Sequence, residues 1–304
     1  MPYDSIVCVK QVPDTANVTA EAMKDDGTVN RAALPTIFNP EDLHALETAL
    51  EVKATYGGTV TAISMGPPKA ADVLRDCLYR GADRTILITD RRAAASDTLA
   101  TSYILAQAIR TVGRFDFVFC GRQAIDGDTA QVGPQCAEKL GIPQITYLEQ
   151  LTEVSDGTVR VRRNVGSGWE IVEGKLPVLI TVIGTANKPR PPASRRVMRY
   201  KRARVRAEVA AEVDRQLAGA PEEDRRAEVG RRSETLKQAG LLIEQWDLDD
   251  VRADLSRCGI AGSPTKVFRV QAIVLTKQGY TDIPPTEEGV RRLIQELVVD
   301  RTLG

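Results

Sequence analysis

The chain has 304 residues, enough for about two domains' worth of core, and its 42% hydrophobic, 27% charged and 5% aromatic residues are typical of a globular protein. The 41 Lys and Arg residues balance the 41 Asp and Glu residues, which argues against the overall positive field of a nucleic-acid-binding protein. No apolar run is long enough to span a membrane, and the start of the chain does not resemble a secretory signal. A single histidine excludes multi-histidine metal sites. Five widely spaced cysteines predict reduced, mostly buried thiols in a cytoplasmic protein.

Short apolar runs rich in β-branched residues alternate with helical stretches over the first two thirds of the chain. Such runs suit strands buried on both faces of a parallel sheet, and they lie at Ser5–Lys10, Thr59–Ser64, Thr85–Ile88 and Phe115–Cys120. Between and after them, apolar residues recur at helical spacing, which predicts right-handed βαβ units. The predicted fold class is therefore α/β, with an open, doubly wound, mostly parallel sheet.

Three later runs are predicted to add antiparallel strands to this sheet. They lie at Gln144–Glu149, Val159–Val165 and Pro177–Ile183, and turn-forming residues separate them. After Gly184 the composition changes to Pro-rich and then strongly basic sequence. We therefore place a domain boundary near residue 185.

A charged insert occupies about residues 205–239. Val205, Val209, Val213 and Leu217 recur every four residues, which predicts an amphipathic helix, and a break at 219–221 precedes a second charged helix. Two interpretations of the insert remain: a solvated surface hairpin with many ion pairs, or a docking element for a partner protein. A terminal amphipathic helix is predicted at Thr286–Val298.

Suggestive turns follow four of the predicted strands, at the edge where open parallel sheets bind ligands. These turns contain Cys8 and Lys10, then Met65, then Ser96-Asp97-Thr98, and finally the long segment from Cys120 to Gln131. No Gly-x-Gly-x-x-Gly motif follows a strand and no P-loop occurs, so the common nucleotide fingerprints are missing from the sequence.

The segment 120–131 is the most informative of the four turns. Gly121 and Gly127 allow the main chain to approach a ligand closely, and Arg122 adds a cation. Asp126, Asp128 and Thr129 are residue types that cap helices, and a helix N-terminus is a ready phosphate site.

Caps without any ligand would also explain the turns at 96–98 and 120–131. Thr101 and Ser102 favour a bound ligand over a simple cap, because they add hydroxyl groups one turn after Thr98. Two helix N-termini facing one crevice would hold the two phosphates of a dinucleotide.

Taken together, the turns resemble those of the β subunit of electron transfer flavoproteins. The residues that carry the resemblance are Val9–Asp14, Asn39-Pro40, Ser64–Pro67, Gly81–Arg84, Gly121–Gln131 and Ala261–Val267. Each turn alone is weak evidence for the family, but the order and spacing of all the turns together are specific to it.

The resemblance implies a heterodimer with an α subunit that carries one FAD. In ordinary members the β subunit holds a structural AMP. In the electron-bifurcating branch it holds a second FAD, which accepts electrons from NADH. One electron then goes to ferredoxin or flavodoxin, and the other passes through the α-subunit FAD to an acyl-CoA dehydrogenase or a quinone oxidoreductase. Residues Gly127–Pro134 and Ser96–Ser102 resemble the bifurcating branch.

The resemblance also implies which residues bind the cofactor, while the cofactor itself performs the redox chemistry and no side chain acts as an acid or base. Cys8 and Lys10 are expected near the adenine or the flavin, and Asn39 and Met65 in the adenine pocket. The pyrophosphate, ribose and flavin are expected at Asp97, Thr98, Thr101, Gly121, Arg122, Gln123, Ala124, Ile125, Asp126, Gly127, Asp128, Thr129, Ala130, Gln131 and Val132.

Two alternatives remain open. The first is the same role with AMP in place of FAD, and the second is a nucleotide-binding signalling module similar to universal stress proteins, whose usual phosphate loop does not occur here. We expect a nucleotide-binding domain at 1–185. A C-terminal extension at 186–304 would carry the charged insert and a partner-contacting arm. In the stretch 192–198, Ser194 stands near the position where mammalian-type members insert a leucine into their dehydrogenase.

Overall fold

The computed structural model describes residues 2–14, 34–265 and 282–299. Its main feature is a nine-stranded sheet with the strand order β11-β5-β4-β1-β6-β10-β7-β8-β9, and a small second sheet pairs β2 with β3. The strands are β1 (Ser5–Cys8), β2 (Gln11–Pro13), β3 (Thr36–Phe38), β4 (Val60–Met65), β5 (Arg84–Ile88), β6 (Phe117–Gly121), β7 (Gln144–Ser155), β8 (Thr158–Asn164), β9 (Trp169–Lys175), β10 (Val178–Val182) and β11 (Glu244–Trp246).

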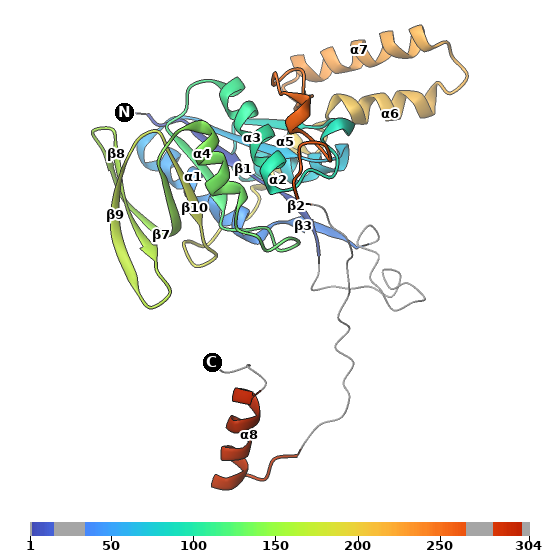
Figure 1. The fold of residues 1–304 in the computed structure, drawn as a ribbon. Coiled ribbons are helices and arrows are strands. Elements are labelled where there is room, and N and C mark those ends of the chain that lie inside the picture. Colours follow the sequence, from blue (N-terminus) through green and yellow to red (C-terminus); the bar gives the residue numbers. More distant parts are fainter. Residues whose placement is uncertain (1, 15–33, 266–281, 300–304) are drawn as a thin grey trace.

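Helices cover both faces of the sheet, as the doubly wound prediction requires (Figure 1). The helices are α1 (Pro40–Tyr56), α2 (Ala71–Arg80), α3 (Thr98–Val112), α4 (Val132–Leu140), α5 (Ser194–Tyr200), α6 (Arg206–Gln216), α7 (Glu222–Gln238) and α8 (Glu287–Val299). Leu46 of α1 and Leu74 of α2 belong to one buried cluster, whereas Ile104 of α3 and Cys136 of α4 belong to another. Within the described residues, no helix is both long and apolar enough to cross a membrane.

The central strands are buried on both faces, which explains their continuous apolar sequences. Every residue of β1, β6 and β10 is buried, and all three strands run parallel to one another. The prediction of a mostly parallel α/β sheet is therefore confirmed. All five cysteines are buried and unpaired, as predicted.

One predicted strand direction is wrong. The run at 177–183 forms β10, which lies parallel to β6 and β7 instead of adding an antiparallel strand. Beyond β7, at the end of the sheet, β8 and β9 are the antiparallel additions, through the pairings of β7 with β8 and of β8 with β9. The two hairpin-like runs before it favoured an antiparallel strand, whereas the continuous apolar sequence of β10 matches its burial on both faces between β6 and β7.

The C-terminal part also contributes to the sheet and to its cover. β11 pairs in parallel with β5, and α5 packs against α2. The charged insert forms α6 and α7, which project together from the body (Figure 1). Figure 1 draws α8, the predicted terminal helix, apart from that body.

Candidate functional site

The main cavity lies at the carboxyl ends of the parallel strands. β1 and β6 are neighbours there, but the chain after β1 leads to α1 on one face, and the chain after β6 leads to α4 on the other. Open α/β sheets bind ligands at such a switch point. The cavity has a volume of about 810 Å³, near the upper end of the usual range for small-molecule sites.

The structure brings most of the predicted site residues to this one cavity. Those that line it are Cys8, Lys10, Met65, Asp97, Thr98, Thr101, Gly121, Arg122, Gln123, Ala124, Gly127, Thr129, Ala130, Gln131 and Val132. Four predicted residues do not line it: Asn39, Ile125, Asp126 and Asp128.

The first turn of α1 holds the long loop after β6 in place. The Asn39 side chain is fully buried; its Nδ2 donates to the Gln123 carbonyl at 2.8 Å, and its Oδ1 accepts from the Ile125 N–H at 3.1 Å. Glu41 Oε2 accepts from the Gln123 N–H at 3.0 Å. Asn39 thus supports the cavity from behind, and Pro40 at the first helical position fixes where α1 begins.

Asp42 joins the two strands at the switch point, although no sequence motif singled it out. Its Oδ2 accepts from the Lys10 N–H at 2.8 Å and its Oδ1 from the Gly121 N–H at 3.0 Å, so one carboxyl group links the ends of β1 and β6. A Cβ at Gly121 would lie 2.5 Å from Asp42 Oδ1, which explains why only glycine fits there.

The pKa of Asp42 is raised to about 7 because burial penalises the carboxylate. Hydrogen bonds from Asn39, Lys10 and Gly121, together with the positive charge of Lys10, oppose this rise without cancelling it. Asp42 therefore places a titratable carboxyl group in the wall of the cavity.

The segment between β6 and α4 crosses the mouth of the cavity as an irregular loop. The Lys10 ammonium group bonds to both Asp126 oxygens at 2.7 and 2.8 Å, and Gln123 Nε2 donates to Asp128 Oδ1 at 2.9 Å. Asp128 and Ala130 have φ values of 48° and 52°, a left-handed conformation that non-glycine residues adopt mainly where the surroundings require it. Asp126 and Asp128 therefore shape the loop.

Helix α4 begins at Val132, later than the capping residue types at 126–129 suggested. Its N-cap is Gln131, which makes no side-chain capping bond, so the idea that Asp126, Asp128 or Thr129 caps the helix is wrong. Asp126 and Asp128 instead accept hydrogen bonds from Lys10 and Gln123, before the helix starts. The uncapped first turn borders the cavity through Val132 and Gly133 and offers backbone N–H groups suited to a phosphate.

Helix α3 has the predicted cap. Asp97 Oδ1 accepts from the Ala100 N–H at 3.0 Å, and its Oδ2 accepts from the Thr265 N–H at 3.0 Å. Burial acts to raise the pKa of Asp97, but these N–H donors outweigh it and lower the pKa overall. Thr98 Oγ1 donates to Gln131 Oε1 at 2.9 Å and so joins the starts of α3 and α4.

The late loop at 261–267 supports the same helix start. Ser263 Oγ accepts from the Asp97 N–H at 2.8 Å, while Lys266 and Val267 lie outside the described residues. The sequence patterns missed the part of the wall that comes from the segment 89–95, including Arg91, whose only signal was a cation shortly after a strand end.

The cavity fits an adenine dinucleotide better than a metal or a simple anion. Lys10, Arg91 and Arg122 supply cations, Cys8, Met65 and Ile88 supply apolar surface, and α4 supplies free N–H groups. Within the described residues, no group of His, Cys, Asp and Glu side chains is arranged to hold a metal ion.

Comparisons with known proteins identify the family of the chain. A model of the electron transfer flavoprotein domain matches residues 26–213. The electron transfer flavoprotein subunit beta of Megasphaera elsdenii is 48% identical over 272 residues, which cover 87% of this chain and 86% of that protein. The corresponding subunit of Clostridium acetobutylicum is 39% identical over 292 residues, 96% of each chain.

Relatives with other names align over similar lengths. Protein FixA of Bradyrhizobium diazoefficiens is 36% identical over 98% of this chain and 92% of its own, and the acryloyl-CoA reductase electron transfer subunit gamma of Anaerotignum propionicum is 38% identical over 96% and 98%. With a family match over most of the chain and relatives aligned along nearly all of it, this protein belongs to the electron transfer flavoprotein family, among its β-type subunits.

Proposed function

We propose that this chain is the β subunit of a heterodimeric electron transfer flavoprotein and binds FAD in the cavity at the carboxyl edge of the sheet. The observation that carries the proposal is that the N-termini of α3 and α4, joined by the hydrogen bond from Thr98 to Gln131, meet at one cavity of about 810 Å³. An adenine mononucleotide needs one phosphate site and little further space. A dinucleotide needs both helix starts and the apolar wall.

Bound FAD supplies the redox chemistry, and the chain supplies position and electrostatics. The backbone N–H groups of α4 and the Thr98 and Thr101 side chains would hold the pyrophosphate. Asn39, Glu41 and Asp42 keep the surrounding loops rigid, so that the binding groups are in place before the cofactor arrives. The ion pair between Lys10 and Asp126 ties the loop after β6 to the end of β1.

We further propose that NADH is the electron donor and that the electron pair is split. One electron would go to ferredoxin or flavodoxin, and the other, through the FAD of the α subunit, to an acyl-CoA dehydrogenase or a quinone oxidoreductase. The name of the Anaerotignum relative, which couples an electron transfer subunit to acryloyl-CoA reductase, supports an acyl-CoA-linked acceptor. We also propose a cytoplasmic location, where ferredoxin or flavodoxin would be available.

The terminal helix α8 is the proposed arm that contacts the α subunit. Val290, Ile294 and Val298 recur at a spacing of four along it, and all three are at least half exposed. A helix with this apolar stripe gains stability when a partner covers the stripe.

An anaerobic titration with NADH tests the proposed function. With the heterodimer, we expect NADH to reduce bound flavin and to reduce ferredoxin or flavodoxin only when the high-potential acceptor is also present. Ferredoxin reduction without that acceptor, or no reduction of flavin by NADH, would contradict electron splitting. In the latter case the alternative role, with structural AMP in this chain, becomes the better account.

A further inference from the structure

Helices α3 and α4 lie side by side (Figure 1), and hydrogen bonds between polar side chains join their first turns. Thr98 Oγ1 donates to Gln131 Oε1 at 2.9 Å. One turn farther along, the Ser102 hydroxyl shares its hydrogen between Gln135 Oε1 at 3.2 Å and the Leu99 carbonyl of its own helix at 2.9 Å. Both interhelical pairs are 33 residues apart in the chain, so the helices run parallel and in register, and both begin at the cavity.

The pair formed by Ser102 and Gln135 lies next to buried apolar side chains of both helices. Ser102 is fully buried, and the Cys136 thiol of α4 donates to its carbonyl at 3.5 Å. Leu105 of α3 and Ala137 of α4 belong to the same buried cluster as Cys136. A polar pair beside apolar side chains favours one register of the helices, because another register would place the Gln135 amide against carbon atoms without a partner.

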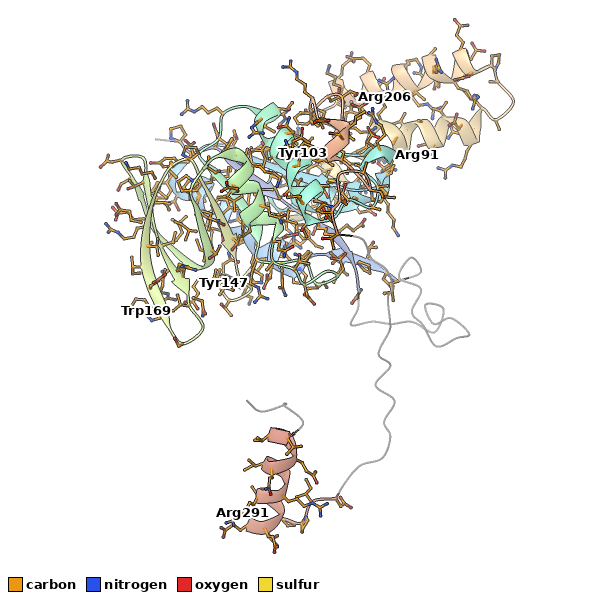
Figure 2. All side chains as sticks on the ribbon, in the orientation of Figure 1. Arg91, Tyr103, Tyr147, Trp169, Arg206 and Arg291 are labelled. Atoms are coloured by element: carbon orange, nitrogen blue, oxygen red, sulfur yellow. The ribbon has the colours of Figure 1, made fainter. Side chains whose placement is uncertain are left out.

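Helix α3 is also anchored through the neighbouring residue, Tyr103, which Figure 2 shows on this helix. The Asp254 N–H donates to Tyr103 Oη at 2.9 Å, and the Arg257 guanidinium carbon lies 4.0 Å from the centre of the tyrosine ring. The Tyr103 side chain is buried. Because these contacts hold α3 in place, the Ser102–Gln135 pair sets where α4 stands against it.

The relative position of the two helices matters because each offers a different set of phosphate-binding groups. The start of α4 has no side-chain cap and offers backbone N–H groups, whereas α3 offers the hydroxyl groups of Thr98 and Thr101. The pyrophosphate of a dinucleotide uses both sets at once, and the single phosphate of AMP uses one of them. A shift of α4 against α3 therefore weakens the binding of a dinucleotide more than the binding of AMP.

We propose that Ser102 and Gln135 are positioning residues that make the cavity prefer FAD over AMP. Neither residue lines the cavity, so the pair acts on the cofactor through the start of α4 and not by contact. The pair keeps the N–H groups of α4 opposite the hydroxyl groups of α3. This inference rests on the proposed function, since it explains which nucleotide that cavity selects.

Competition between FAD and AMP on the purified heterodimer tests this preference, with Ser102→Ala and Gln135→Ala as the main variants. The heterodimer is equilibrated with a fixed excess of FAD and rising concentrations of AMP, and the FAD that remains bound is quantified. We expect half displacement at an AMP concentration about fivefold lower in each variant than in the unmodified heterodimer, the usual effect of losing one hydrogen bond. The double variant should show the same shift as either single variant, because the two side chains act as one pair.

Thr111→Ala is the matched control. Thr111 also lies on α3, but its hydroxyl donates to the Gln107 carbonyl of the same helix at 2.9 Å. We expect this variant to need the same AMP concentration as the unmodified heterodimer. A general folding defect is recognised separately, because it would weaken the binding of FAD and of AMP alike and leave the ratio of the two affinities unchanged.

The outcomes separate this proposal from the proposed function. An unchanged ratio of the FAD and AMP affinities in Ser102→Ala and Gln135→Ala would overturn the positioning role. A double variant whose shift is the product of the two single shifts would also overturn it, because the side chains would then act independently. An unmodified heterodimer that holds AMP and no FAD in this chain would instead contradict the proposed function, and the inference would fall with it.

Discussion

The carboxyl edge of the sheet and the helical hairpin of α6 and α7 both use carboxylates, but in different surroundings. At the edge, Asp42 is buried and accepts two backbone N–H groups. In the hairpin, pairs such as Arg226 and Glu222 are largely exposed, and the apolar contact is the small seam of Val209, Val213 and Val229. Burial makes the polar groups of the edge costly to alter, whereas water can replace those of the hairpin.

The strongest test of this contrast is the pH dependence of stability in Asp42→Asn. Because the pKa of Asp42 is about 7 in the folded chain and near 3.8 when unfolded, the folded state binds an extra proton between these values. Raising the pH through this range therefore removes stability from the unmodified protein, by up to about 1.4 kcal/mol per pH unit relative to the variant. Chemical unfolding from pH 4 to 8 measures it. Parallel pH curves for the two proteins would contradict the prediction.

Gly121→Ala is expected to have the next largest effect. The new Cβ would lie 2.5 Å from Asp42 Oδ1 and 2.7 Å from the backbone of α1, and backbone cannot easily move aside. We expect a loss of about 3 kcal/mol in the free energy of unfolding, together with weaker nucleotide binding. Gly168→Ala is the control, since a Cβ at that position would have nothing within 4 Å and Gly168 does not line the cavity. Equal effects of the two substitutions would show that the contact with Asp42 does not matter.

Val213→Ala tests the hairpin itself. Removing two carbon atoms from a fully buried valine should cost about 1.5 kcal/mol. We expect this loss to appear as faster hydrogen exchange confined to α6 and α7, with unchanged nucleotide content. A fall in nucleotide content would show that the hairpin and the cavity are coupled, and the contrast between the two regions would then fail.

Arg226→Gln should have the smallest effect. Arg226 and Glu222 are both mostly exposed, so their ion pair gains little over solvation by water. We expect an unchanged Tm and unchanged electron transfer to the native acceptor. Slower transfer would support the interpretation of the insert as a docking element, because it would show that a partner uses this charged surface.

The sequence predicted the parts of the fold that follow from local patterns. Continuous apolar runs located β1, β4, β5 and β6, and the spacing of valines located α6. The direction of β10 was predicted wrongly although its continuous apolar run is of the same kind as those of β1 and β6, because its position after two hairpin-like runs favoured an antiparallel addition. The strand β9 also had no predicted counterpart, since its exposed residues lack a clear alternation.

For the site, the sequence indicated which turns meet but not what each side chain does there. The resemblance placed Asn39 in the adenine pocket, whereas its amide bonds to the loop backbone behind the cavity. Asp42 looked like an ordinary first-turn residue, because its two bonds join segments 32 and 79 residues away. Long-range polar contacts of this kind leave no local pattern in the sequence.

The central claim is that the cavity between the starts of α3 and α4 holds FAD, and counting the cofactors tests it most directly. The chain would be purified with its α subunit and denatured, and the released FAD and AMP would be quantified per heterodimer. We predict two FAD and no AMP. One FAD with one AMP would contradict the claim and make this chain a structural nucleotide holder, and the absence of a second nucleotide would mean that the turns at the strand ends serve only the fold.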